Sequence, residues 1–278
     1  MGTHVVLRRF GLVLSAVLVL HCASGAPDPA TLASNSDQVI WEAAQKAQQR
    51  KQWDSARQLC KRIVDGFPQS ELGPGARLAL ADSYFQEGGT GNWILAVSAY
   101  RDFLTLYPSH PKSDYAQFQV GEGFFQQRNG ADRDQTPTTH ALEEYQRLLE
   151  LYPASPQVEA ARARIVACRQ SLAKSEYLAG IFYERRGTCR AAAFRYEGLI
   201  ADYPDYVGID EVLYRLSTCL SRTGRALEAA PHLSRLIEEF PTSGYVDQAR
   251  TLLQTIPNLP PATPIATPSP APKVPSGP

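Results

Sequence analysis

Apolar residues recur at steps of three and four along most of the chain, and this spacing predicts a succession of amphipathic helices. In one segment the apolar positions are Ala141, Tyr145, Leu148, Leu149 and Tyr152. A later segment repeats the spacing at Ala192, Tyr196, Leu199, Ile200 and Tyr203. No stretch shows the strict alternation of apolar and polar residues that is typical of a strand. The pattern therefore predicts an all-α fold.

An aromatic residue followed by proline closes five of the helical segments, at Phe67-Pro68, Tyr107-Pro108, Tyr152-Pro153, Tyr203-Pro204 and Phe240-Pro241. Twelve residues before each proline stands an alanine, at Ala56, Ala96, Ala141, Ala192 and Ala229. In three repeats a serine follows two residues after the proline, at Ser70, Ser155 and Ser243. Each dipeptide predicts a helix end, because proline restricts the residue before it and cannot continue the hydrogen-bond ladder. The recurrence indicates an internal repeat.

A second small residue stands upstream of each of these alanines. The pairs are Ala44/Ala56, Ala81/Ala96, Gly121/Ala141, Gly180/Ala192 and Ser217/Ala229. Small side chains on two facing helices let the backbones approach closely, as in the tetratricopeptide repeat, a helical hairpin of about 34 residues. We therefore expect a superhelical solenoid of about five tetratricopeptide-like hairpins over residues 37–255.

Insertions lengthen several repeats. Residues 88–91 widen the turn of the second repeat. Residues 127–140 widen that of the third, where Thr136 is predicted to cap a helix that starts at Pro137. Residues 156–172 predict an extra or extended helix before the fourth repeat.

The first 22 residues predict an export signal, because a short basic region at Arg8 and Arg9 precedes an apolar run too short to span a bilayer. Cys22 stands where a bacterial lipoprotein signal carries the cysteine that becomes lipidated, although His21 replaces the usual small residue. A competing cleavage after Gly25 would discard Cys22 and leave a protein without an anchor. Residues 23–36 are expected to form a flexible linker.

The end of the chain has a different composition. Residues 257–278 contain nine prolines among alanine, threonine and serine. Such a segment buries little apolar surface, so residues 256–278 are expected to form a disordered or extended tail.

Charge and motifs exclude several classes of function. The chain has 28 basic and 28 acidic residues and no basic stripe, which argues against nucleic acid as a partner. It lacks HExxH, GxSxG and the phosphate-binding GxxxxGK[ST] loop, and we expect no enzyme activity, no metal and no cofactor. Cysteines other than Cys22 lie within the helical pattern, where they behave as small buried hydrophobes, although an oxidising compartment would permit a disulfide; they are Cys60, Cys168, Cys189 and Cys219.

Binding is expected on two surfaces. The first helices of the first three hairpins are predicted to line a concave face that carries Trp41, Phe85, Tyr115, Phe118 and Phe125. Aromatic anchors suit an extended peptide with aromatic side chains, and the alternative is that these rings pack between hairpins. The fourth hairpin is rich in arginine, and Arg185 and Arg195 are candidate partner contacts, or else simply solvated.

Several ordered motifs carry a family resemblance. Residues 132–136 (DRDQT), 152–155 (YPAS), 172–176 (LAKSE), 182–187 (FYERRG) and 192–196 (AAFRY) resemble the BamD, or ComL-type, outer-membrane assembly lipoproteins. The similarity spans residues 39–250, and its middle part is the specific one.

The resemblance implies a non-catalytic, periplasm-facing lipoprotein of the machinery that inserts β-barrel proteins into the outer membrane. It implies Cys22 as the lipid site, an aromatic-ending C-terminal signal of unfolded barrel substrates as the ligand of the N-terminal repeats, and Arg195 as a contact with the barrel-shaped insertase. Accessory lipoproteins would be further partners. The other hypothesis is a periplasmic tetratricopeptide scaffold that coordinates cell-wall synthesis or division.

Overall fold

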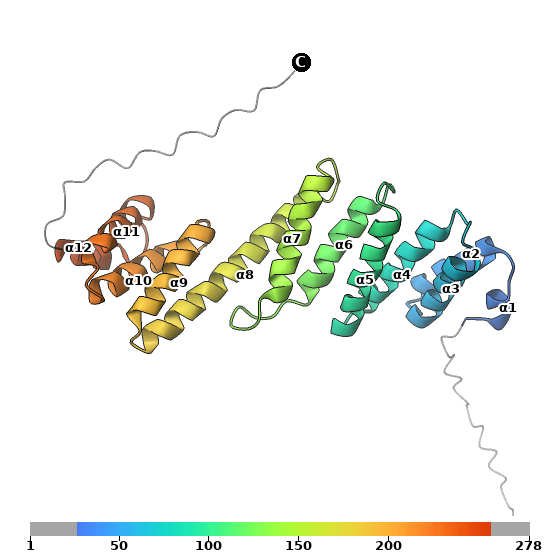
Figure 1. Cartoon of the computed structure of the whole chain (residues 1–278), viewed down its shortest axis with the longest axis horizontal. Helices are drawn as coiled ribbons and strands as arrows, with labels where there is room; N and C mark the ends of the chain where they lie inside the picture. The colour runs from blue at the N-terminus through green and yellow to red at the C-terminus, as the bar shows by residue number, and fades with distance from the viewer. Residues whose placement is uncertain (1–26, 257–278) are drawn as a thin grey trace, which may run out of the picture.

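The computed structural model of the chain describes residues 27–256, and within them every regular element is a helix (Figure 1). The helices form hairpins that follow one another in a row along an elongated molecule. Their bounds are α1 Pro29–Leu32, α2 Asp37–Gln49, α3 Trp53–Gly66, α4 Gly73–Glu87, α5 Thr90–Leu106, α6 Ser113–Gln126, α7 Thr136–Leu151, α8 Val158–Arg185, α9 Cys189–Asp202, α10 Ile209–Arg222, α11 Ala226–Glu239 and α12 Val246–Gln254. The predicted all-α solenoid is confirmed.

Five hairpins make up the solenoid, α2/α3, α4/α5, α6/α7, α8/α9 and α10/α11, and α12 packs against the last of them. The extensive helix contacts join helices that are consecutive in the chain. This is the quasi-one-dimensional packing of a repeat protein, in which each hairpin is stabilised mainly by its neighbours.

The aromatic–proline dipeptides end the second helix of every hairpin. Phe67, Tyr107, Tyr152, Tyr203 and Phe240 are all C-cap residues, and each donates its amide to the carbonyl four residues earlier. The structure explains why a serine follows three of the prolines. The hydroxyls of Ser70, Ser155 and Ser243 donate to Asp37, Asp114 and Asp210 at 2.5, 2.7 and 2.6 Å. Each serine thereby ties the end of a hairpin to the first turn of that hairpin's first helix.

The paired small residues lie at the helix crossings, as predicted. Gly121 and Gly180 face tyrosine rings of the partner helix, so that an added Cβ would lie 2.7 Å from Tyr145 and 2.2 Å from Tyr196. Both tyrosines are fully buried. The glycines are therefore required by the close approach of a ring rather than by an unusual backbone angle.

Helix α8 is the predicted extended helix, and it belongs to two units (Figure 1). Its first half contributes Ala161 and Cys168 to a core cluster with Tyr145 of α7. Its second half contributes Ala173 to the next cluster, which contains Tyr196 of α9. One continuous helix thus closes the third hairpin and begins the fourth.

The boundaries of three predicted segments differ slightly. Helix α7 starts one residue earlier than expected, at Thr136, whose amide and hydroxyl both donate to the carboxylate of Asp134. The C-terminal part of the expected linker contains the short helix α1, and Leu32 packs on the first core cluster. Ile256, placed at the start of the tail, is 6% exposed and belongs to the last core cluster.

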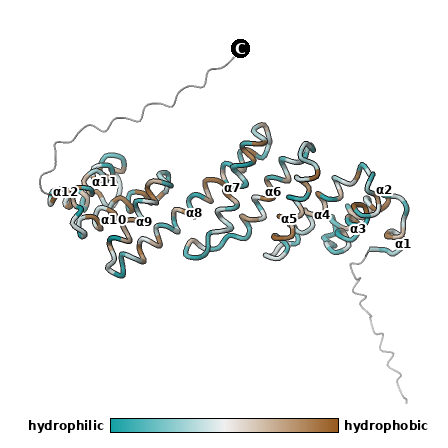
Figure 2. Tube along the Cα trace, in the orientation of Figure 1, coloured by the Kyte–Doolittle hydropathy of each residue, from teal (hydrophilic) through white to brown (hydrophobic). Residues whose placement is uncertain are grey.

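Within residues 27–256 no helix combines the length and apolar character needed to cross a bilayer. Figure 2 shows apolar and polar residues interspersed along the helices. The predicted export signal, Cys22 and the proline-rich residues from 257 onward lie outside the described residues.

Candidate functional site: two grooves on the solenoid

The aromatic residues predicted to share one binding face lie in different places in the structure. Some pack against other helices, and one lines a groove. Trp41 packs on the first core cluster, and its ring lies 3.6 Å from the position that a Cβ on Gly75 of α4 would occupy. It thus joins the first helices of two successive hairpins. Phe118 lies 5.7 Å, centroid to centroid, from the buried ring of Tyr145. The rings of Trp41 and Phe118 are both half-buried, the first between two hairpins and the second against the partner helix of its own hairpin.

Tyr115 belongs to a buried polar cluster on the same face. Its hydroxyl donates to Oδ1 of Asp82 at 2.9 Å, and the hydroxyl of Tyr100 donates to the same oxygen at 2.5 Å. Burial raises the pKa of the Asp82 carboxyl, although the two hydroxyls favour its ionised form and nearby Lys112 acts in the same direction. Asp82 therefore fastens α4 to α5 and α6 rather than offering a charge to a ligand.

Phe125 does not form part of an exposed binding face, because only 8% of its surface is exposed. The guanidinium carbons of Arg128 and Arg164 lie 3.4 and 4.2 Å from its ring centroid. Arg164 in turn binds both carboxylate oxygens of Glu122, at 2.6 and 3.0 Å. The ring is part of the core between the third hairpin and α8, where cation–π contacts stabilise it.

A tyrosine–carboxylate pair recurs in the three central hairpins and was not foreseen from the sequence. The tyrosine stands four residues after the crossing alanine of the second helix, and its hydroxyl donates to a carboxylate of the first helix. The pairs are Tyr100–Asp82 at 2.5 Å, Tyr145–Glu122 at 2.5 Å and Tyr196–Glu184 at 2.9 Å. The fixed spacing of alanine and tyrosine was the available signal. Two acceptors, Asp82 and Glu122, directly follow the small residue of the first helix, whereas Glu184 stands four residues after it, so the sequence did not show one common spacing.

Phe85 lines a groove of about 520 Å³ at the edge of the solenoid, where the turns of the first two hairpins meet the end of α6. The groove combines three aromatic rings with amides and one cation; it is lined by Lys51, Trp53, Phe85, Gln86, Gly88, Trp93 and Gln126. Lys51 is exposed and takes part in none of the ion pairs found among the described residues. The groove can hold an aromatic side chain beside a carboxylate.

A second groove, of about 940 Å³, opens between the turn of the fourth hairpin and the end of α10. Phe194 stands in it with 72% of its surface exposed. Its lining combines this ring with three arginines; the residues are Tyr183, Gly187, Thr188, Cys189, Arg190, Ala191, Phe194, Arg195, Arg222 and Thr223. An apolar centre rimmed by cations suits a protein partner that offers apolar and acidic side chains.

Arg195 lines this second groove, and Arg185 does not. Nη1 of Arg195 lies 3.1 Å from the carboxylate of Glu176, and this contact raises the pKa of the guanidinium. Arg185 is exposed in the last turn of α8, just before the loop that joins α8 to α9. The structure thus brings only one of the two predicted arginines into the groove.

The described residues contain no cluster of three or more histidine, cysteine, aspartate or glutamate side chains able to hold a metal ion. Among the same residues, every buried side-chain nitrogen and oxygen atom has a hydrogen-bond partner. The two grooves present aromatic rings and charged side chains to solvent.

Stacked hairpins of this kind, closed by paired small residues at each crossing, define the tetratricopeptide class of solenoid proteins, and the tetratricopeptide-repeat family model matches residues 211–243. A solved tetratricopeptide structure, the TPR2AB domain of yeast Sti1 in complex with an Hsp90 peptide, aligns with 78% of the chain and 83% of its own length, at 13% identity and a TM-score of 0.45.

The chain belongs to the YfiO outer membrane lipoprotein family, whose model matches residues 33–226. Relatives named outer membrane protein assembly factor BamD include those of Haemophilus influenzae (25% identity over 78% of the chain and 85% of the relative) and Caulobacter vibrioides (26% over 86% and 78%). The BamD of Vibrio cholerae is 28% identical over 69% of the chain and 82% of its own length. The predicted family is confirmed.

Proposed function

We propose that this chain is a lipid-anchored, periplasm-facing component of the β-barrel assembly machinery of the outer membrane. It is a non-catalytic scaffold that holds the insertase and accessory lipoproteins with one groove and unfolded barrel substrates with the other. Membership of the outer membrane lipoprotein family supports this proposal most strongly, since the relatives are named as assembly factors. Cys22 is the proposed lipid attachment site.

The groove around Phe85 is the proposed substrate site. Trp53, Phe85 and Trp93 offer rings on which an aromatic side chain stacks, and Lys51 offers a cation to a chain-terminal carboxylate. These are the two features of an aromatic-ending C-terminal signal. Trp41, Tyr115 and Phe118 serve this site indirectly, because they hold the hairpins that form it in register.

The groove around Phe194 is the proposed docking site for the insertase. Exposed aromatic rings and arginines are the residue types that dominate binding energy at protein interfaces. Arg190, Arg195 and Arg222 would pair with carboxylates of the insertase's periplasmic domains, and Phe194 would fill an apolar pocket on the partner. Arg185 extends the basic surface beyond the groove.

A peptide-binding experiment tests the substrate site. A labelled peptide with the C-terminal sequence of an outer-membrane barrel protein is titrated with the full chain and with a Phe85→Ala/Trp93→Ala variant. Loss of two stacking rings should weaken binding at least tenfold, because together they contribute on the order of 1.4 kcal/mol or more to binding. Amidation of the peptide's terminal carboxylate should weaken binding to the unchanged chain as well.

The matched control is Phe194→Ala, which removes a more exposed ring from the other groove and should leave the peptide affinity unchanged. Circular dichroism establishes that both variants keep the helical fold. Equal affinity of the unchanged chain and the Phe85→Ala/Trp93→Ala variant would refute the substrate site.

A further inference from the structure

Two of the four cysteines among the described residues are neighbours, and the other two are isolated. Cys60 lies in the cluster of the first hairpin and Cys168 in that of the third, each as its cluster's single cysteine. Cys189 and Cys219 share the largest cluster, between the fourth and fifth hairpins. All four are buried. The pairing of two thiols in one cluster sets this place apart from the rest of the core.

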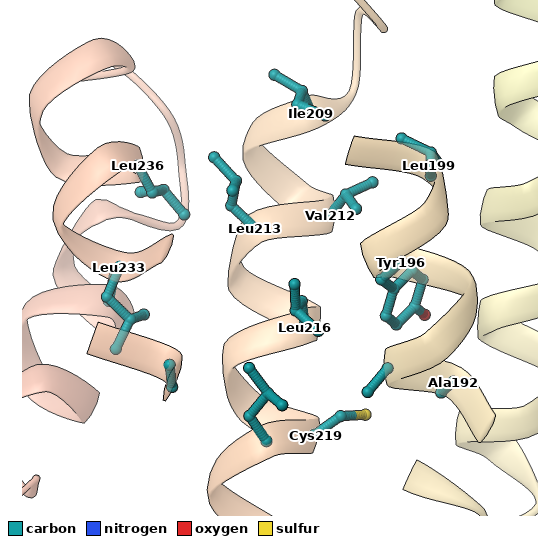
Figure 3. Close-up of a cluster of buried hydrophobic side chains, with 14 of the residues drawn as sticks. Ala192, Tyr196, Leu199, Ile209, Val212, Leu213, Leu216, Cys219, Leu233 and Leu236 are labelled. Atoms are coloured by element: carbon teal, nitrogen blue, oxygen red, sulfur yellow. The ribbon is translucent and has the colours of Figure 1, made fainter. Parts of the chain in front are cut away.

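The fold brings the two thiols together at one end of a helix pair. Cys189 is the first residue of α9, and Cys219 lies near the end of α10, the helix that packs beside α9. Figure 3 shows the sulfur of Cys219 directed from α10 toward α9, the helix that begins at Cys189.

The two thiols differ in access. Cys219 is fully buried, and burial, with the neighbouring Cys189 thiol, raises the pKa of Cys219 to about 12. It is therefore a poor nucleophile near neutral pH, because the thiolate is the reacting form. Cys189 is 8% exposed and lines the groove that contains Phe194. A reagent in the groove thus reaches Cys189 first.

We propose that Cys189 and Cys219 form an oxidation site at which an intramolecular disulfide joins α9 to α10 beside the groove. The oxidant is the disulfide of another protein or of a small thiol compound. The sulfur of Cys189 attacks one sulfur of that disulfide, forms a mixed disulfide and releases the other sulfur as a thiol. The sulfur of Cys219 then displaces the second sulfur, so that two S–H bonds are replaced by one S–S bond and the oxidant leaves as two thiols.

The bond would close a loop that contains the whole of α9 and most of α10. A link of this length stabilises the native state by restricting the unfolded chain. It would also fix the start of α9, which carries Arg190 and Phe194, against the end of α10, which carries Arg222. Oxidation would therefore hold the wall of the proposed docking groove in one shape. Formation of the bond in the cell rests on the proposed periplasmic location, whereas its formation in the purified protein does not.

The test uses the full chain, purified under reducing conditions and then exposed to oxidised glutathione. Free thiols are alkylated in denaturant, and tryptic peptides are identified by mass spectrometry. Trypsin releases Cys189 in residues 187–190 and Cys219 in residues 216–222, so a bond between them appears as a linked pair of distinct peptides. The expected result is this linked pair. The oxidised chain should also melt several degrees above the reduced chain, and dithiothreitol should return the melting temperature to that of the reduced chain.

A Cys60→Ser/Cys168→Ser variant is the matched control and should give the same linked pair. Cys219→Ala should leave Cys189 as a mixed disulfide with glutathione. Recovery of Cys189 and Cys219 as separately alkylated peptides, or each bound to glutathione with no link, would overturn the proposal. The peptide map of the unaltered chain decides this even if a variant fails to fold.

Discussion

Gly180 and Tyr196 show how closely the two helices of a hairpin approach at a single residue pair. An added Cβ on Gly180 would lie 2.2 Å from the fully buried ring of Tyr196. Gly180→Ala should therefore lower the free energy of unfolding by about 1–3 kcal/mol, the usual cost of overpacking. Urea denaturation followed by circular dichroism measures the change.

Gly198→Ala is the matched control, because Gly198 lies in α9 with no atom within 4 Å of an added Cβ. Alanine should raise stability there by up to about 1 kcal/mol through helix propensity alone. Equal stability of the two variants would contradict a close contact between Gly180 and the ring of Tyr196.

The buried carboxylate of Asp82 gives the protein a dependence of stability on pH. Burial raises the pKa of Asp82 above its ordinary value of 3.8. A carboxyl with a raised pKa in the folded state stabilises that state most below pH 3.8, and this contribution is lost as the pH rises through the folded-state pKa. Above that pH the folded state carries the cost of a buried charge, which Tyr100 and Tyr115 offset only in part.

Asp82→Asn keeps an oxygen that accepts both tyrosine hydroxyls but has no charge. The free energy of unfolding of this variant should therefore increase relative to that of the unchanged chain as the pH rises from 4 to 7. Urea titrations across this range measure the difference. If the difference in free energy of unfolding between the two chains stays constant or decreases over this pH range, the pKa of Asp82 is not raised by burial.

Side-chain hydrogen bonds at the ends of the hairpins join one helix to another. The hydroxyl of Ser155 donates to Asp114 of α6 and accepts the amide of Gln157, so it links the end of α7 to the start of α6 and to the turn before α8. Ser155→Ala should lower the free energy of unfolding by about 1 kcal/mol, the usual effect of losing such a cap.

Ser109 offers the comparison, because it is exposed in the corresponding turn of the second hairpin. Ser109→Ala should change the free energy of unfolding by less than about 0.5 kcal/mol. Thermal and urea unfolding of both variants distinguish a capping serine from a surface one. A neutral Ser155→Ala would mean that the repeated serine has no structural role.

The sequence predicted the elements of this fold well because its signals are local and repeated. Helical periodicity, the aromatic–proline stops and the paired small residues each act within one hairpin, and the structure places all of them as expected. The helix expected at residues 156–172, either extra or extended, is the first part of the continuous helix α8. The start of α7 was missed by one residue, because Asp134 caps the helix from outside it.

The candidate sites were harder to predict because they depend on neighbouring hairpins. Periodicity placed Phe125 on the first-helix face, but it could not show that Arg164, more than 35 residues later, covers the ring. Trp53 and Trp93 were missed, since they line a groove only when two turns come together at the edge of the solenoid. Phe194 was missed because an exposed ring in an amphipathic helix has the same sequence pattern as a half-buried one.

At the scale of the whole molecule, the two grooves are far apart along the row of hairpins. The groove around Phe85 is lined by residues of the first three hairpins and the groove around Phe194 by residues of the last two. Helix α7 and most of α8 separate these two parts of the solenoid (Figure 1). Since each hairpin is held mainly by its neighbours, the solenoid can present two partners at a fixed separation. This arrangement suits a scaffold that brings a substrate to an insertase.

The most direct test of the central claim is a mild-detergent pull-down of the tagged full chain from its native envelope, with partners identified by mass spectrometry. The expected result is recovery of a large outer-membrane barrel with periplasmic domains, together with accessory lipoproteins, and a marked loss of the barrel from an Arg195→Glu chain. Recovery of cell-wall synthases or division proteins without that barrel would contradict the assembly role and favour a different periplasmic scaffold.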